Sequence, residues 1–169
     1  METEFQNKEG MPVYAPGDVI VHPMHGAGRI EEIVEQKVAG ETRSYYVLQI
    51  PTGSVRVMVP VEGSAAIGIR PLIDRETAYA VLDAFAELPT EDDKNWNRRY
   101  RENMLRLKSG DLYEVSRVVR GLMLRERSHG LSTGERKMLG TSRQILLSEL
   151  ELATGESHDA LLARLAGTL

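Results

Sequence analysis

The residues best suited to do chemistry gather around the single tryptophan of the chain, Trp96. Four cations lie beside it in residues 94–101, namely Lys94, Arg98, Arg99 and Arg101. On a helix these side chains lie within about a turn or so of the tryptophan, so one surface can present a flat apolar ring beside guanidinium groups. Cations can hold phosphates while the ring stacks on bases or wedges between them. The alternative is a tryptophan packed at a helix junction with arginine stems lying over it. Tyr100 suits either arrangement.

The charge of the chain is unevenly divided. Residues 94–143 hold 13 Lys and Arg against 5 Asp and Glu, a surplus of 8 positive charges, whereas the net charge of the whole chain is −4. A basic region attracts phosphates whatever the global charge is. This segment therefore predicts a local polyanion-binding surface, and a set of solvated helix faces is the alternative.

The sequence contains no convincing catalytic or metal-binding pattern. His22 and His25 form a pair that is able to chelate a metal, but protein metal sites usually have three or four ligands and the chain has no cysteine. Gly26-Ala-Gly28 lacks the third glycine and the following helix that dinucleotide binding requires. No P-loop, nucleophile-elbow or zinc-protease motif occurs. We expect a protein that is not an enzyme and that uses no cofactor or metal.

The first third of the chain predicts short strands separated by turns. The β-forming runs are residues 13–14, 18–22, 29–34, 45–50 and 55–59, and glycine-containing turn signals such as Pro16-Gly17, Ala39-Gly40 and Thr52-Gly53 lie between them. Short strands at this spacing predict a small, strongly bent antiparallel barrel.

From residue 74 onward the apolar residues follow helical spacing. Helices are predicted over residues 74–86, from 90–93 to 108, 111–130, 132–150 and 157–165, with capping-box patterns at Asp111 and at Ser132. Glycine and proline break the chain between residues 60 and 74. The sequence therefore predicts an α+β protein, with a barrel over residues 13–66 and a compact all-α domain over residues 67–169.

The sequence also bears on location. Its first ten residues are acidic and polar, and no stretch reaches the roughly 18 apolar residues that a membrane span requires. A chain without cysteine suits a reducing compartment. We expect a cytoplasmic protein with no membrane partner.

The motifs resemble those of the CarD/CdnL family of bacterial RNA polymerase-binding transcription regulators over roughly residues 14–155. In the strand-rich part they are Pro16-Gly-Asp-Val-Ile-Val-His-Pro-Met-His-Gly-Ala-Gly28, Tyr45-Tyr-Val-Leu48 and Val55-Arg-Val-Met-Val-Pro60. In the helical part they include Asn95-Trp-Asn-Arg-Arg-Tyr100, Gly134-Glu-Arg-Lys-Met-Leu139 and Arg143-Gln-Ile-Leu146. Their order and spacing make coincidence improbable.

The resemblance implies a Tudor-like barrel that binds the RNA polymerase β subunit, a domain also found in the transcription-repair coupling factor. The implied contact lies on the strand carrying Arg56, Met58 and Pro60, with a contribution from Gln36. Some relatives have arginine where this chain has Gln36 and Met58, so the contact is more apolar here.

The resemblance also implies a helical domain that binds promoter DNA largely without sequence preference. Its wedge tryptophan falls on Trp96, and its phosphate-contacting cations fall on Arg98, Arg99 and Arg101, with Arg125 and Arg136 further away. The implied function is stabilisation of the promoter open complex at the upstream edge of the bubble. A non-enzymatic adaptor, whose basic helices bind an acidic protein, is the alternative.

Overall fold

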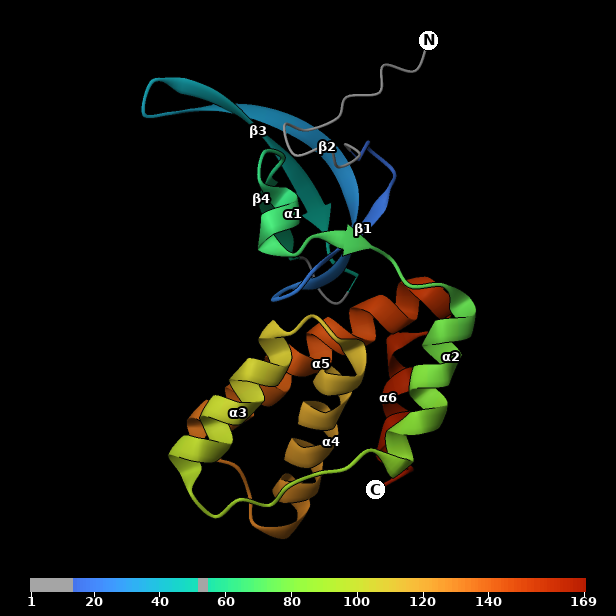
Figure 1. The fold of residues 1–169 in the computed structure, drawn as a ribbon. Helices are drawn as coiled ribbons and strands as arrows, with labels where there is room; N and C mark the ends of the chain where they lie inside the picture. The colour runs from blue at the N-terminus through green and yellow to red at the C-terminus, as the bar shows by residue number, and fades with distance from the viewer. Residues whose placement is uncertain (1–13, 52–54) are drawn as a thin grey trace.

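The computed structural model describes residues 14–51 and 55–169 of the chain. A sheet built from strands between residues 19 and 71 lies above a group of helices built from residues 75–166 (Figure 1), which confirms the predicted α+β class. Val13, the predicted first barrel residue, and the predicted Thr52-Gly53 turn lie outside the described residues.

The sheet has five antiparallel strands in the order β4-β3-β2-β1-β5. The strands are β1 (Val19–His22), β2 (Gly26–Val38), β3 (Glu41–Gln49), β4 (Arg56–Pro60) and β5 (Arg70–Pro71). The predicted turn at Ala39-Gly40 joins β2 to β3, and both residues have the positive φ angles (52° and 81°) of a tight hairpin turn. The β2–β3 hairpin extends away from the helices (Figure 1).

Side chains on one face of the sheet form its own apolar core. Tyr46 and Leu48 of β3 and Val59 of β4 lie on this face and pack with Ile20, Ile30, Ile50 and Ile69. The predicted barrel is an open, bent sheet among the described residues, since β4 and β5 form its two edges and are not paired with each other. The register shifts between Ile30 and Glu32 through a bulge, which increases the local twist.

The sequence predicts neither of two short elements near the predicted domain boundary. Helix α1 (Ser64–Ile67) is a single turn, and β5 pairs with β1 through only two residues. Both are too short to show periodicity. The division at residues 66 and 67 stays a prediction; the sheet module, as we use the term, runs to Pro71.

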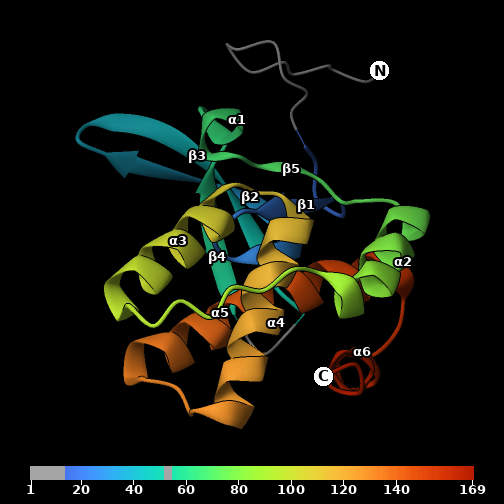
Figure 2. The same ribbon diagram turned by 60° about the horizontal axis from the view of Figure 1, so that its bottom comes forward.

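Helices form the second module, which has a separate core. They are α2 (Arg75–Ala84), the 3₁₀ turn η1 (Phe85–Glu87), α3 (Trp96–Lys108), α4 (Leu112–Ser128), α5 (Thr133–Thr154) and α6 (His158–Ala166). Asp74, Asn95, Asp111, Ser132 and Ser157 cap the N-termini of the five α-helices through their side-chain oxygens. Along α5, α3 lies toward one end and α2 and α6 toward the other (Figure 2). In the described part of the chain, no helix is long and apolar enough to cross a membrane.

The start of α3 differs from the prediction. The helix begins at Trp96, with Asn95 as its cap, and not at residues 90–93. We call residues 89–93 (Pro-Thr-Glu-Asp-Asp) the acidic segment. Its carboxylates lie against arginines of α3 and α4, pairings that no local pattern encodes.

Helix α5 holds the two modules together. Ser148 Oγ accepts a hydrogen bond from the backbone N–H of Ala27 (3.0 Å), and Gln144 donates to the carbonyl of His25 (3.0 Å). At the residue after Ser148, the fully buried Glu149 accepts two hydrogen bonds of 2.7 Å from Arg70 of β5. The pairing with Glu149 raises the pKa of Arg70.

The glycine at position 26 permits this close approach. A Cβ there meets the Ser148 hydroxyl and lies 3.1 Å from backbone atoms of Gln144 and Ile145, and its φ of +98° favours glycine. Gly17 has a similar φ of +95° but open space around it.

We expect Gly26→Ala to destabilise the protein by about 2–4 kcal/mol, because overpacking against α5 adds to the strain of a positive φ. The matched control Gly17→Ala carries only the backbone strain, about 1 kcal/mol. Urea unfolding measures both. Equal losses in the two variants contradict the tight junction.

Candidate nucleic-acid interface and polymerase-binding strand

Trp96 lies on the surface at the first turn of α3, and its ring is held in place. The side chain is 42% exposed. Its indole N–H donates to Ser132 Oγ (3.0 Å), and its ring stacks on Tyr100 with centroids 5.0 Å apart and planes 19° apart. A Cβ at Gly134 lies 3.5 Å from the indole, so this glycine leaves room for the ring. The one polar atom of the ring is satisfied internally, and its apolar surface faces outward.

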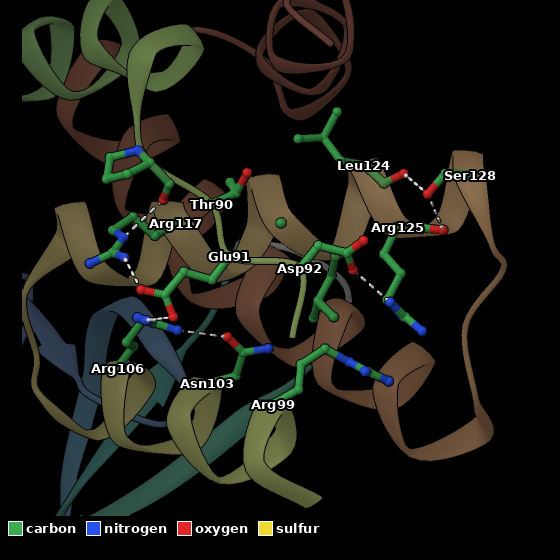
Figure 3. Close-up of a pocket in the computed structure, with 13 residues that line it drawn as sticks. Thr90, Glu91, Asp92, Arg99, Asn103, Arg106, Arg117, Leu124, Arg125 and Ser128 are labelled. Carbon is green, nitrogen blue, oxygen red and sulfur yellow. Dashed lines mark hydrogen bonds and ion pairs between the residues drawn. The ribbon is translucent and has the colours of Figure 1, made fainter. Parts of the chain in front are cut away.

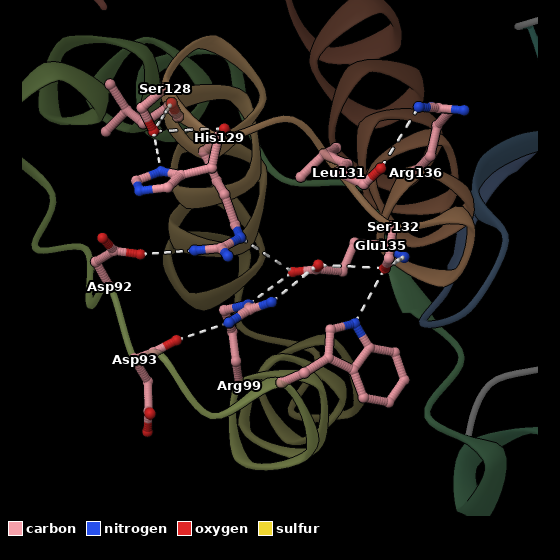
Figure 4. Close-up of polar contacts among 12 residues, drawn as sticks. Asp92, Asp93, Arg99, Ser128, His129, Leu131, Ser132, Glu135 and Arg136 are labelled. Atoms are coloured by element: carbon pink, nitrogen blue, oxygen red, sulfur yellow. Dashed lines mark hydrogen bonds and ion pairs between the residues drawn. The ribbon is translucent and has the colours of Figure 1, made fainter.

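A buried ion pair fixes the two helices that carry these groups. Arg99 of α3 donates to both oxygens of Glu135 on α5 (2.7 and 3.0 Å) and to the carbonyl of Asp93 (2.7 Å), as Figure 4 shows. Ser132 accepts from the Glu135 N–H and donates to its carboxylate. The hydrogen bonds from Arg99 lower the pKa of Glu135 and raise the pKa of Arg99. The carboxylate is therefore ionised at neutral pH.

The predicted phosphate-binding cations fall into two groups. Arg98, Arg101 and Arg136 are exposed, although Arg98 lies 3.4 Å from Asp93 and Arg136 donates to the carbonyl of Leu131 (3.4 Å). Arg99 is only 7% exposed, so its guanidinium serves the internal pair. The side chain of Arg125 is 20% exposed and binds Asp92 (2.8 Å). We therefore keep the first three as phosphate contacts in the proposal below and assign Arg99 a positioning role.

Sequence reasoning missed the residues that orient the tryptophan. In the sequence, Ser132 and Glu135 form only a capping pattern, which concerns one helix. In the structure the same two side chains reach across to α3. One signal is present in the sequence: Glu135 lies on the apolar stripe of its helix, where side chains are expected to be buried. A buried acid requires a partner, so this position predicts a cation beside it.

The predicted polymerase-binding residues lie on an exposed edge of the sheet. Arg56, Met58 and Pro60 alternate along β4 with Val57 and Val59, which face the core. Met58 is 43% exposed, and Arg56 lies 3.4 Å from Glu31. Gln36 of β2 is exposed and pairs with Arg43 of β3, two positions beyond the Val34–Tyr45–Pro60 row. The structure therefore places Arg56, Met58 and Pro60 together on β4 and places Gln36 apart from them, two strands away and beyond the end of β4.

His22 and His25 lie close together, but no third potential metal ligand joins them among the described residues. The rings lie 4.5 Å apart, and burial, with a smaller effect of His25, lowers the pKa of His22 to about 4. In residues 14–51 and 55–169, no group of three or more His, Cys, Asp or Glu side chains is arranged to hold a metal.

The fold and these two surfaces define an α+β protein in which a sheet module with an exposed edge is joined firmly to a helical module with an aromatic and basic surface. Two family models match the chain, one described as the CarD-like/TRCF RID domain over residues 14–73 and one as the CarD C-terminal domain over residues 80–166. The chain therefore belongs to the CarD family of transcription factors, and its first module is an RNA polymerase-interaction domain.

A curated relative agrees with this assignment. The chain is 35% identical over 139 residues to a protein of Bacillus subtilis (strain 168) named "Putative transcription factor YdeB", a match that covers 82% of this chain and 91% of that protein.

Two contacts hold the indole of Trp96, the hydrogen bond to Ser132 and the stacking on Tyr100, and we call them the clamp. Because Trp96 is the only tryptophan of the chain, its fluorescence reports on the clamp directly. We expect Ser132→Ala to free the indole, so that acrylamide quenches its fluorescence more strongly, and to cost about 1 kcal/mol through loss of the helix cap. Ser157→Ala is the matched control, because Ser157 caps α6 in the same way without touching the ring. Equal quenching in both variants contradicts the clamp.

Proposed function

We propose that this protein is a non-enzymatic regulator that binds the RNA polymerase β subunit through β4 and stabilises the promoter open complex through Trp96. The observation that carries the proposal is an exposed tryptophan, held by internal contacts, on a module that α5 joins to a sheet with an exposed edge strand. Family membership supplies the polymerase as the partner.

The edge strand suits a protein partner. An edge strand presents backbone N–H and C=O groups that a strand of another protein can pair with, while alternate side chains give specificity. On β4 these side chains are Arg56, Met58 and Pro60. Met58 supplies an apolar anchor. Gln36 supplies amide donors and acceptors at a second point, two strands away on β2 and four positions beyond the Met58–Val47–Glu32 row.

The junction at α5 determines where the helical module stands once β4 is bound. Because Glu149 and Ser148 hold the sheet while Glu135 and Ser132 hold α3, the tryptophan is carried at a defined position relative to the polymerase. A tethered group acts at a high effective concentration, so the DNA-binding surface itself needs little affinity for free duplex.

The chemistry of the Trp96 surface favours recognition of shape over base identity. The indole N–H is already bound to Ser132, so the ring offers apolar surface to an unstacked junction. Arg98, Arg101 and Arg136 supply charge for phosphates, whose contacts carry little sequence information. We therefore expect slight sequence specificity.

Stabilisation follows from differential binding. A protein that binds melted promoter DNA better than closed DNA shifts the melting equilibrium by that difference. An aromatic–base contact contributes roughly 1–3 kcal/mol, which changes the open-complex population by about 5- to 150-fold if the contact forms only in the open state.

Trp96→Ala tests the wedge. We expect the open complexes of a bacterial polymerase holoenzyme on an unstable promoter to lose the lifetime extension given by the wild-type protein, about 5-fold or more. Polymerase binding should be unchanged. The control Leu105→Ala removes a 63% exposed apolar residue from the same helix and should retain the extension. An equal loss in both variants argues against a specific wedge.

Met58→Glu tests the strand. We expect polymerase affinity to fall by about tenfold or more, because a charge must be buried in the apolar contact. The control Ile67→Glu changes a residue of similar exposure, 42%, that lies off β4. Binding is measured by calorimetry with purified core polymerase. If the two variants bind alike, β4 is not the contact.

These experiments also separate the proposal from a protein adaptor. An adaptor retains polymerase binding through β4 but shows no preference for fork-junction DNA over duplex in the presence of polymerase, and Trp96→Ala leaves open complexes unchanged.

A further inference from the structure

We propose that a cavity between α3, α4 and the acidic segment is a binding site for a small polyanion bearing at least two phosphoryl groups. The cavity has a volume of about 190 Å³, and four guanidinium groups line it. They come from Arg99 and Arg106 of α3 and from Arg117 and Arg125 of α4. This site is separate from the exposed cations around Trp96.

The arginines are held largely out of solvent at two ends of the cavity. The side chains of Arg106, Arg117 and Arg125 are 19%, 20% and 20% exposed. Figure 3 shows Arg106 and Arg117 together at one end and Arg99 with Arg125 at the other. Buried guanidinium groups require anionic partners, and a partner that spans both ends needs more than one anionic group.

In this structure, surface carboxylates of the chain itself serve as anionic partners for three of these arginines. Glu91 lies between Arg106 (3.6 Å) and Arg117 (4.0 Å), and Asp92 lies 2.8 Å from Arg125. Their side chains are 61% and 66% exposed, so water solvates both. Exposed ion pairs of this kind contribute little stability. An incoming anion can therefore replace them at small cost.

The charges that remain after such an exchange match a polyanion. Glu114 stays bound to Arg106 and Arg117, at 3.5 and 3.2 Å, and Glu135 stays bound to Arg99. With Glu91 and Asp92 withdrawn, the four arginines exceed these two carboxylates by two positive charges. Arginine forks bind phosphoryl oxygens through paired hydrogen bonds, and the low local dielectric strengthens them.

A glycine keeps the cavity open. Gly121 lies inside α4 and lines the cavity, and a Cβ there meets only Thr90, at 3.8 Å. Glycine in a helix interior costs roughly 1 kcal/mol relative to alanine, and nothing in the packing requires it here. Its absence of a side chain preserves the space.

Inorganic pyrophosphate is the test ligand, titrated into the full-length chain by calorimetry at constant ionic strength. We expect saturable 1:1 binding. Arg106→Gln/Arg117→Gln should weaken it by about tenfold or more through loss of charge-assisted hydrogen bonds. Glu91→Gln/Asp92→Asn should tighten it by roughly threefold or more, because the internal competitors lose their charge. Arg43→Gln, an exposed change on β3, is the matched control and should bind as the wild type does.

A second variant covers the case in which the arginine pair fails to fold. Gly121→Leu fills the cavity and removes a helix-interior glycine, so it should fold and lose pyrophosphate binding. Thermal unfolding checks that every variant is folded.

Three outcomes overturn the proposal. In the first, neither the wild type nor Glu91→Gln/Asp92→Asn binds pyrophosphate saturably. In the second, Gly121→Leu binds pyrophosphate as tightly as the wild type does. In the third, Arg106→Gln/Arg117→Gln loses affinity for fork DNA but not for pyrophosphate. The last identifies the cavity as part of the DNA contact. None of these outcomes bears on Met58→Glu or on the Trp96→Ala promoter assay, so failure here is distinguishable from failure of the proposed function.

Discussion

Two buried carboxylates on α5, Glu135 and Glu149, are the constraint on which the arrangement of this protein depends. Each accepts paired hydrogen bonds from an arginine of another element, Arg99 of α3 and Arg70 of β5. They stand 14 residues apart on one helix, a distance of about 21 Å at 1.5 Å per residue. Removing one partner of a buried pair costs about 3–5 kcal/mol, so the tryptophan surface and the sheet are both fixed to the same rigid element.

Contacts with Ser132 and Tyr100 hold the exposed ring of Trp96 in one orientation. Ser132 and Tyr100 occupy its polar edge and one part of its ring surface, which reduces the ordering that binding requires. What remains outward is apolar and flat. We propose that such a surface distinguishes an open junction from a stacked duplex by shape, with the exposed cations beside it adding affinity for phosphates without adding a sequence code.

The acidic segment reduces the positive charge that residues 94–143 present to solvent. Residues 94–143 carry the surplus in the sequence, but Glu91, Asp92 and Asp93 lie just before that window and fold back onto it. Several arginines are therefore neutralised internally, and the accessible positive charge is smaller than the composition suggests. The arginines of the cavity are held largely out of solvent at its two ends, and Glu91 and Asp92, which pair with three of them, lie at the surface.

Periodicity and capping residues in the sequence determined the α+β class, the antiparallel strands and most helix starts, because strand alternation and N-caps are local effects. Motif resemblance identified Trp96 and β4 as the surfaces of interest. Only the tertiary structure decided that Arg99 points inward, that Ser132 orients the indole, that the described strands form an open sheet and that α3 starts after the acidic segment. Each of these depends on side chains far apart in the sequence, such as Arg99 and Glu135, which meet only when α3 and α5 pack together. No local pattern encodes such a meeting.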